Sequence, residues 1–469
     1  DTYNTAIGFN AGLAVTTGTL NTLIGGLAGD ALTSGNSNVA VGYGSLTTDT
    51  LGDRNVAIGN SALEQQNFTT TTDAYNVAVG YTAGQSLTTG LYNTLIGGQA
   101  GDALTDADNN VAVGTGALGA DTLGSTSVAI GNNTLLAQNF TTATNSYNTA
   151  VGNSAGKAVT TGIYNTIVGG LAGDALTDAD DNTVFGFGAL ASDTLGSKST
   201  ALGRGTLVAQ NFTTATDSYN TAVGYFAGNA VTTGVQNVLM GGLAGDALTD
   251  ADFNVAIGTG ALSSDTLGST STAIGNNTLY AQNFTTATNN YNTAVGYYAG
   301  VAVTTGILNT LVGGLAGDAL TTGGENVAVG YSALTADDLG SHTVAVGPYA
   351  LQSQNYATAT DSYNTAVGYN AGGVLSTSRF NTIVGGLAGD ALTTSVGYNT
   401  VFGYNALSAD TLGQENCAIG SQALSAQNFT TAVAAYNTAV GTSAGRLVSS
   451  GIQNTFIGGL AGDATTDAD

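Results

Sequence analysis

The sequence has very little of several residue types on which whole classes of protein depend. Its 469 residues include one Cys, one Pro, one His and no Trp. A single Cys excludes a disulfide framework. A single Pro excludes collagen, which also needs Gly at every third position. No apolar run approaches the roughly 18 residues of a membrane-spanning helix, so we expect no membrane insertion.

Basic residues are also scarce, and they are scattered singly along the chain. The net charge is −25. Nucleic-acid binding requires clustered Lys or Arg that displace counterions, so we expect no nucleic-acid partner. The same scarcity argues against binding to anionic membrane surfaces. The basic residues are Arg54, Lys157, Lys198, Arg204, Arg379 and Arg446.

One pentamer organises what remains. It reads Asn-Val-Ala-Val-Gly at residues 76–80 and returns, lightly edited, 26 times. Successive copies are separated by steps of 17, 17, 17 and 21 residues, with one 18-residue step between Asn381 and Asn399. Each step defines one coil, and four coils make a 72-residue repeat. Fixed-period similarity of this kind is typical of a solenoid.

The pentamer has the character of a short β-strand. Its second residue is Thr or Val except at Cys417, its third is mostly Ala, its fourth is always apolar and its fifth is always Gly. The invariant Gly predicts a bend with positive φ or a close backbone approach. Alternate residues of a strand point to opposite faces. We expect the β-branched second and fourth residues to fill the interior of each coil. The small third residue then faces outward, which suggests that a second chain packs closely there.

Asn occupies the first pentamer position in 22 of the 26 coils. Stacked at one corner, these side chains would form a hydrogen-bonded ladder. The alternative is an isolated Asx turn in each coil. The regular register favours the ladder.

These features predict an all-β fold, a parallel β-solenoid of about 26 coils in repeats of 17+17+17+21 residues. We expect an intertwined or side-by-side homotrimer. A spacing of about 4.8 Å between coils gives a rod of about 125 Å. Residues 1–469 then form one repetitive shaft, and the absence of caps indicates a segment of a longer fibre or end-to-end stacking. The repeats start near residues 4, 76, 148, 220, 292 and 364, with a partial repeat from 437.

The fourth coil of each repeat carries two recurring aromatic positions, which we expect to pin its four extra residues to the rod. Cys417 reads as a small buried hydrophobic residue. His342 occupies a position that varies freely between repeats, which indicates an exposed and undemanding site. The aromatic positions are Phe68, Phe140, Phe212, Phe284, Tyr356 and Phe429, and Tyr75, Tyr147, Tyr219, Tyr291, Tyr363 and Tyr436.

Asp is the only residue type that suggests site chemistry. One position holds Asp in every repeat, as at Asp102, and a second holds Asp121 and its equivalents. Some repeats add an Asp-Ala-Asp segment, as at Asp106 and Asp108. Adjacent coils could bring these carboxylates together into a calcium site. The alternative, which we favour, is Asx turns and a solvated acidic face. We predict no other cofactor and no catalytic site, since carboxylates repeated on a rod lack the pocket that shifts a pKa.

The pentamers at residues 55–59, 127–131 and 343–347 resemble those of trimeric autotransporter adhesin heads. Residues 93–97, followed by Gly-Asp-Ala-Leu-Thr at 101–105, look closer to the repeats of phage and viral tail fibres. The resemblance implies a left-handed parallel β-roll, with three chains side by side, serving as an extracellular shaft or attachment surface.

The first functional hypothesis is therefore structural. The chain would be the shaft of a phage or viral tail fibre on the virion surface, holding a tip that binds a host receptor. One alternative is a bacterial cell-surface adhesin whose rod face contacts the target. Another is an extracellular filament of solenoids stacked end to end. None of these is an enzyme.

Overall fold

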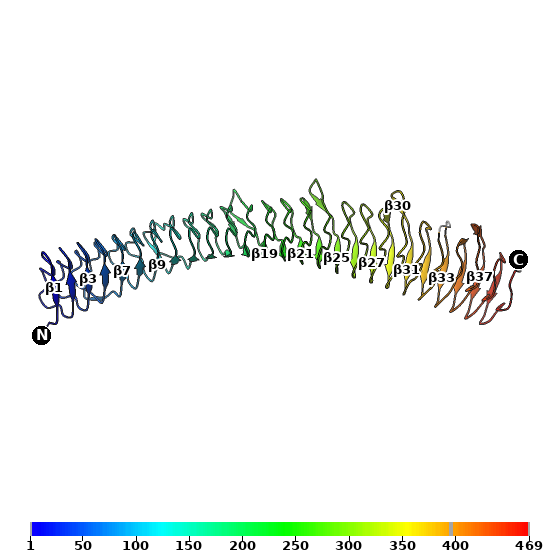
Figure 1. Ribbon diagram of the computed structural model, residues 1–469, viewed down its shortest axis with the longest axis horizontal. Helices are drawn as coiled ribbons and strands as arrows, with labels where there is room; N and C mark the ends of the chain where they lie inside the picture. The colour runs from blue at the N-terminus through cyan, green and yellow to red at the C-terminus, as the bar shows by residue number, and fades with distance from the viewer. Residues whose placement is uncertain (1, 394–396, 468–469) are drawn as a thin grey trace. The chain divides into compact units, whose positions relative to one another are not determined.

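The computed structural model describes residues 2–393 and 397–467. The chain forms two compact units, Asp1–Val235 and Gln236–Asp469. Each unit is a parallel β-solenoid in which every coil adds one strand to a long sheet (Figure 1). The described residues contain no helix and hence none able to cross a bilayer. The expected all-β solenoid of about 26 coils is confirmed.

The sheet of the N-terminal unit consists of three-residue strands, one per pentamer. They are β1 (Thr5–Ile7), β2 (Thr22–Ile24), β3 (Val39–Val41), β5 (Val56–Ile58), β7 (Val77–Val79), β8 (Thr94–Ile96), β9 (Val111–Val113), β11 (Val128–Ile130), β13 (Thr149–Val151), β14 (Thr166–Val168), β15 (Thr183–Phe185), β17 (Thr200–Leu202) and β19 (Thr221–Val223).

The C-terminal unit repeats this arrangement with another thirteen strands. They are β20 (Val238–Met240), β21 (Val255–Ile257), β23 (Thr272–Ile274), β25 (Thr293–Val295), β26 (Thr310–Val312), β27 (Val327–Val329), β29 (Val344–Val346), β31 (Thr365–Val367), β32 (Thr382–Val384), β33 (Thr400–Phe402), β35 (Cys417–Ile419), β37 (Thr438–Val440) and β38 (Thr455–Ile457).

Two-residue strands form small parallel pairs beside the longer coils. In the N-terminal unit they are β4 (Gly52–Asp53) with β6 (Thr72–Asp73), β10 (Gly124–Ser125) with β12 (Thr144–Asn145), and β16 (Gly196–Ser197) with β18 (Thr216–Asp217). In the C-terminal unit they are β22 (Gly268–Ser269) with β24 (Thr288–Asn289), β28 (Gly340–Ser341) with β30 (Thr360–Asp361), and β34 (Gly413–Gln414) with β36 (Val433–Ala434).

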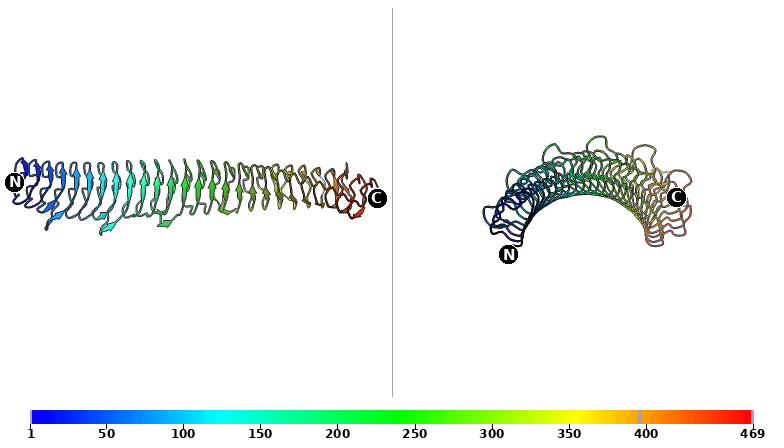
Figure 2. Two further views of the ribbon diagram at one scale, coloured as in Figure 1. Left: turned by 90° about the horizontal axis from the view of Figure 1, so that it is seen from below. Right: turned by 60° about the vertical axis from the view of Figure 1, so that its left-hand side comes forward.

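Pentamers stack directly on one another. Within each unit the arrows of successive strands lie side by side (Figure 2). Across the 21-residue coil, Val56 of β5 pairs with Val77 of β7, and Ala57 pairs with Ala78. The register is therefore unbroken, and the four extra residues are accommodated elsewhere in the coil. The pairs β4–β6, β10–β12 and their counterparts join that longer stretch to the coil before it.

The expected orientation of the strands is wrong. The middle residue, usually Ala, is buried in every three-residue strand except β1 and β38, whereas the second and fourth pentamer residues are half-buried or exposed. Ala57 and Ala78, for example, are fully buried. The strands thus contribute small side chains to the interior, and their β-branched residues point outward.

Space inside the coil explains this inversion. The Leu that replaces Ala in the second coil of a repeat lies against the Gly residues of its own coil and of the coil before. A Cβ added to Gly84 would meet Cδ1 of Leu95 at 2.7 Å, and one added to Gly101 would meet Cδ2 of Leu95 at 2.8 Å. Leu95 therefore fills the space beside the strands of two coils, and Leu87 and Leu104 of the same coils are also fully buried. This leaves room only for Ala on the neighbouring strands.

The invariant Gly at the end of each pentamer is required for two reasons. At Gly97 the backbone has a φ of 136°, a conformation that L-residues rarely adopt. A Cβ there would lie 2.5 Å from the carbonyl oxygen of Gly114 on the next coil. The expected bend and close backbone approach are both confirmed.

Candidate functional surfaces

The most extensive candidate surface is the outer face, defined here as the side of the long sheet that carries the second and fourth pentamer residues. Its second row is mainly Thr and Val, and its fourth row is entirely apolar. Phe185 and Phe402 are 57% and 55% exposed, and Ile58 is 38% exposed. Parallel sheets normally have both faces covered. The outer face is an apolar strip that its own chain leaves uncovered.

Cys417 belongs to this outer face rather than to the core. It pairs in register with Thr400 of β33 and Thr438 of β37, and its side chain is half-exposed. The expectation of a buried residue is therefore wrong, for the same reason as the strand orientation. Sequence analysis missed the face because it assigned apolar residues to the interior by default.

The Asn ladder is confirmed at the corner where each strand begins. The side-chain carbonyl of Asn76 accepts a hydrogen bond from the backbone N–H of Asn93 at 2.9 Å, and that of Asn93 accepts one from the N–H of Asn110 at 3.0 Å. The amide of Asn93 also donates to the carbonyl of Ala107 at 2.8 Å. These side chains are fully buried. Each one joins its own coil to the next and satisfies backbone groups that would otherwise be orphaned.

A second buried network occurs once in each long coil. Oδ2 of Asp121 accepts from Nε2 of Gln138 at 2.6 Å, while its Oδ1 accepts from the N–H groups of Gly124 and Phe140 at 3.0 and 3.2 Å. Oε1 of Gln138 in turn accepts from the Asn148 amide at 2.9 Å. The network is built the same way around Asp49, Asp193, Asp265, Asp337 and Asp410.

Burial also changes the acidity of two of these carboxyl groups, those of Asp337 and Asp49. Desolvation raises the pKa of Asp337 to about 6, against the lowering effect of its hydrogen bonds from Gln354 and Gly340. Burial likewise raises the pKa of Asp49. Hydrogen bonds to the charged form offset this desolvation only in part.

The calcium candidates lie in different environments. Asp121 is fully buried and its oxygens are occupied by the network described above. Asp102 is half-buried and Asp106 is exposed, where it accepts a hydrogen bond from Thr89 at 2.6 Å. Asp108 accepts from a backbone N–H at 2.7 Å. Within residues 2–393 and 397–467, no three His, Cys, Asp or Glu side chains are grouped as metal ligands would be. Calcium stays a prediction, which thermal unfolding with and without a chelator would test.

The two aromatic positions of the long coil behave differently. Phe140 and its equivalents are at most 7% exposed, so they pin the longer coil to the solenoid as expected. Tyr147 and its equivalents are about half-exposed. Tyr75, Tyr147 and Tyr363 stack on a ring of the next coil, as Tyr147 does on Tyr164 with ring centroids 5.7 Å apart. Only the first position is a core element.

One position beside these Tyr rings holds Arg54, Lys198 or His342 in three of the repeats, and the residue that it faces constrains which side chain it can carry. Arg54 forms an ion pair with Asp73, and Nζ of Lys198 lies 2.5 Å from Oδ2 of Asp217. Nδ1 of His342 lies 3.1 Å from Asp361. The same pair of positions, 19 residues apart, is Thr126 with Asn145, Thr270 with Asn289 and Glu415 with Ala434 in the other repeats.

The two positions therefore vary together. A basic residue faces Asp, a neutral Thr faces Asn, and an acidic Glu faces Ala. His342 also approaches Glu325, with Nε2 3.2 Å from Oε2, and stacks on Tyr363. The expectation that His342 occupies an exposed and undemanding site is wrong, because its ring is half-buried, approaches two carboxylates and stacks on Tyr363.

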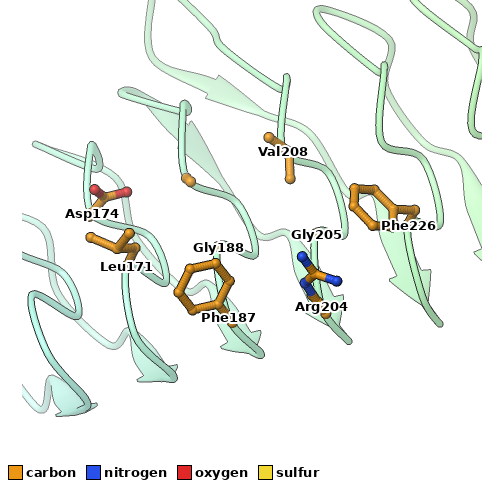
Figure 3. Close-up of a pocket in the computed structure, with 9 residues that line it drawn as sticks. Leu171, Asp174, Phe187, Gly188, Arg204, Gly205, Val208 and Phe226 are labelled. Carbon is orange, nitrogen blue, oxygen red and sulfur yellow. The ribbon is translucent and has the colours of Figure 1, made fainter.

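Two hollows open on the segments that follow the strands of the N-terminal unit. One, of about 350 Å³, is lined by small and apolar residues together with Asp102. The other, of about 310 Å³, contains Phe187, Arg204 and Phe226 (Figure 3). Their lining positions, such as Asp102 and Asp174, are equivalent in successive 72-residue repeats. Sequence analysis did not identify either hollow.

Comparisons of the chain with family models, curated proteins and solved structures give no match.

Proposed function

We propose that the chain is the shaft of an extracellular fibre, built from three copies that pack through their outer faces. The fibre is a tail fibre on the surface of a phage or virus and holds a receptor-binding tip away from its base. The exposed apolar outer face is the observation that carries this proposal. The proposed function involves no catalytic step. The partners of the chain are further copies of itself and a host receptor.

Energetics support coverage of this face. Completing the burial of a half-exposed Val or Ile is worth roughly 1 kcal/mol. The fourth row of either unit has thirteen apolar residues, eleven of them Val or Ile. Together they would contribute on the order of 10 kcal/mol, comparable to the roughly 4–15 kcal/mol cost of association. An identical chain is the natural partner because its apolar rows repeat at the same spacing. The number three follows from the resemblance to fibre repeats, not from this estimate.

The first experiment measures mass in solution. The proposal expects three times the 46.1 kDa of one chain, by light scattering or native mass spectrometry. A mass of one chain at all concentrations would refute packing through the outer face. A mass of two chains would keep the face as an interface and refute the trimer.

Cys417 provides a second, independent test because it is the single Cys and lies on the outer face. In the fibre its thiol should react with maleimide at least tenfold more slowly than in denaturant. The matched control is the double variant Cys417→Ser with Thr431→Cys, which moves the thiol to an exposed residue of the long coil. Equal reactivity at both positions in the native protein would contradict the proposal.

The alternatives are a bacterial adhesin that binds through its own rod face and a filament of solenoids joined end to end. Labelled antibody seen on virions supports the tail fibre, whereas label on bacterial cells supports the adhesin. A filament that grows at its ends and has one chain in cross-section supports end-to-end assembly.

A further inference from the structure

We propose that the hollow around Arg204 binds a small aromatic carboxylate that carries a hydrogen-bond donor at its far end. The hollow lies within the N-terminal unit and has a volume of about 310 Å³, at the lower end of the range for small-molecule sites. Leu171, Phe187, Val208 and Phe226 supply its apolar lining. The inference does not depend on the proposed fibre, since one chain forms the whole site.

The guanidinium of Arg204 determines the charge of the ligand. It lies 5.7 Å from the ring centre of Phe226 and 5.8 Å from that of Tyr225, so the rings hold it by cation–π contacts. No carboxylate pairs with it among the described residues, unlike Arg54 and Lys198. In a chain of net charge −25, an unpaired Arg beside an apolar hollow matches an anionic group joined to an apolar body.

Asp174, at the end of the hollow opposite Arg204, determines the second polar group of the ligand. Oδ1 of Asp174 is buried and accepts no hydrogen bond from the described residues. At the equivalent position of other repeats, Asp246 accepts from Ser263 at 2.7 Å and Asp318 accepts from Thr335, whereas Oδ1 of Asp390 is buried without a partner among the described residues, as in Asp174. Ala191 replaces that hydroxyl here. The carboxyl group of Asp174 lines the hollow and lacks the donor that a ligand hydroxyl would supply.

Figure 3 shows how these groups are arranged. Arg204 lies between Phe187 and Phe226, while Asp174 and Leu171 stand at the other end. Asp174 is two coils before Arg204, which corresponds to about 10 Å at the spacing of adjacent strands. A single ring with a short carboxylate chain and a para hydroxyl has this length.

The repeats themselves show that this hollow departs from the common pattern. At the position of Arg204 the other complete repeats have Asn60, Asn132, Asn276, Pro348 and Ser421. At the position of Gly205 every other complete repeat has a side chain. A Cβ on Gly205 would lie 2.9 Å from the Phe226 ring, so the glycine makes room for the aromatic wall. Phe226 itself replaces Thr82 and Ser154, and the next repeat has Tyr298 at this position.

Several changes at one place are thus coordinated around one hollow. The equivalent hollow beside Asp102 has Asn132 in place of Arg204 and Ser154 in place of Phe226, and it serves as an internal comparison. It has a similar volume but neither the cation nor the aromatic walls. Volume alone does not make the ligand site.

The test uses the full chain and the probe 3-(4-hydroxyphenyl)propionate, with binding followed by calorimetry and ligand-observed NMR. We expect saturable binding of one molecule per chain. Arg204→Asn, which introduces the residue of three other repeats, should weaken binding at least tenfold, because it removes the charge-assisted contact. Replacing the probe's carboxylate by an amide should weaken binding to a similar extent.

Lys198→Thr is the matched control. It removes a positive charge from the same repeat, does not line the hollow and introduces the residue found at Thr126 and Thr270. Its affinity for the probe should stay within twofold of wild type. Absence of saturable binding up to about 10 mM probe, unchanged affinity in Arg204→Asn, or an equal loss in Lys198→Thr would each overturn the proposal. Circular dichroism of each variant confirms that it is folded.

Discussion

At the scale of single residues, this fold depends on backbone conformations as much as on side chains. Many residues other than Gly adopt positive φ, including the one before each pentamer, such as Tyr92 at 59°. The N–H of Tyr92 donates to the carbonyl of Ala74 at 2.9 Å. Cross-coil hydrogen bonds of this kind offset the 1–2 kcal/mol that a left-handed residue typically costs. Sequence analysis anticipated this only for Gly.

The adjacent residues Gly97 and Gly98 allow a matched test. Gly97→Ala should lower the free energy of unfolding by about 2 kcal/mol or more, because the new Cβ meets the Gly114 carbonyl at a positive φ. Gly98 has no positive φ and only one atom within 4 Å of an added Cβ, at 3.9 Å. Gly98→Ala should therefore change stability by less than about 0.5 kcal/mol. Urea unfolding of both variants measures the difference, and equal midpoints would contradict the close-approach argument.

The raised pKa of Asp337 predicts a pH dependence of stability with a definite sign. Folding favours the protonated carboxyl group, so its contribution is fully present below pH 3.8 and is lost as pH rises through about 6. The difference between these two pKa values corresponds to roughly 3 kcal/mol. Between pH 4 and 6, Asp337→Asn should flatten the pH dependence of the melting temperature relative to wild type.

The control for this experiment is Asp106→Asn, which removes an exposed carboxylate of the same chain. Because wild type loses net negative charge at low pH in any case, only the difference between the variants is informative. If both variants follow the wild-type curve, the Asp337 carboxyl group does not titrate in this range in the folded protein.

At the scale of the coil, hydrogen bonds between neighbours are the main specific contacts. The Asn ladder was predictable because a residue at a fixed position in a fixed period must stack on its own copies. The Asp–Gln–Asn network was not, because Asp121, Gln138 and Asn148 are brought together only by the path of the long coil. Sequence spacing alone placed Asp121 on an acidic surface.

Removing one Asn side chain from the ladder should destabilise the coils around it. In Asn93→Ala, the N–H of Asn110 and the carbonyl of Ala107 lose their partners inside the fold. We expect a loss of roughly 2–4 kcal/mol and faster hydrogen exchange at the Asn110 amide. Asn132→Ala, which alters an exposed residue, should leave that exchange rate unchanged. Unchanged exchange in both variants would show that the ladder contributes no stability.

The matched charges of the long coil can be tested by a double-mutant cycle at Arg54 and Asp73. Arg54→Thr alone and Asp73→Asn alone should each destabilise by up to about 1 kcal/mol, the usual range for exposed ion pairs. The double variant reproduces the Thr126–Asn145 pair of the next repeat, and it should recover part of the loss. Purely additive effects would mean that the two positions vary together for another reason.

At the scale of the molecule, the outer face decides how chains associate. Val151 belongs to its fourth row and is half-buried. Val151→Glu should leave the secondary structure intact and weaken association of the chains at least tenfold, since a carboxylate would be desolvated at the interface. Thr141→Glu adds the same charge to an exposed residue of the long coil and should leave the assembly mass unchanged. An unchanged mass in Val151→Glu would exclude the outer face as the interface.

The sequence by itself determined the strand positions, the coil count, the Asn stack and the need for Gly after each strand. These follow from periodicity, because a residue repeated at every coil must lie beside its own copies. Only the tertiary structure decided which face of the strand points inward. Alternation defines two faces without assigning them, and the β-branched residues suggested the wrong one. The interior is narrow and already holds several buried Leu side chains in each repeat, such as Leu95, Leu104 and Leu118. The strands therefore direct Ala inward and Val, Ile and Thr outward. The tertiary structure also revealed the apolar outer face and the hollow at Arg204, both of which depend on how neighbouring coils pack.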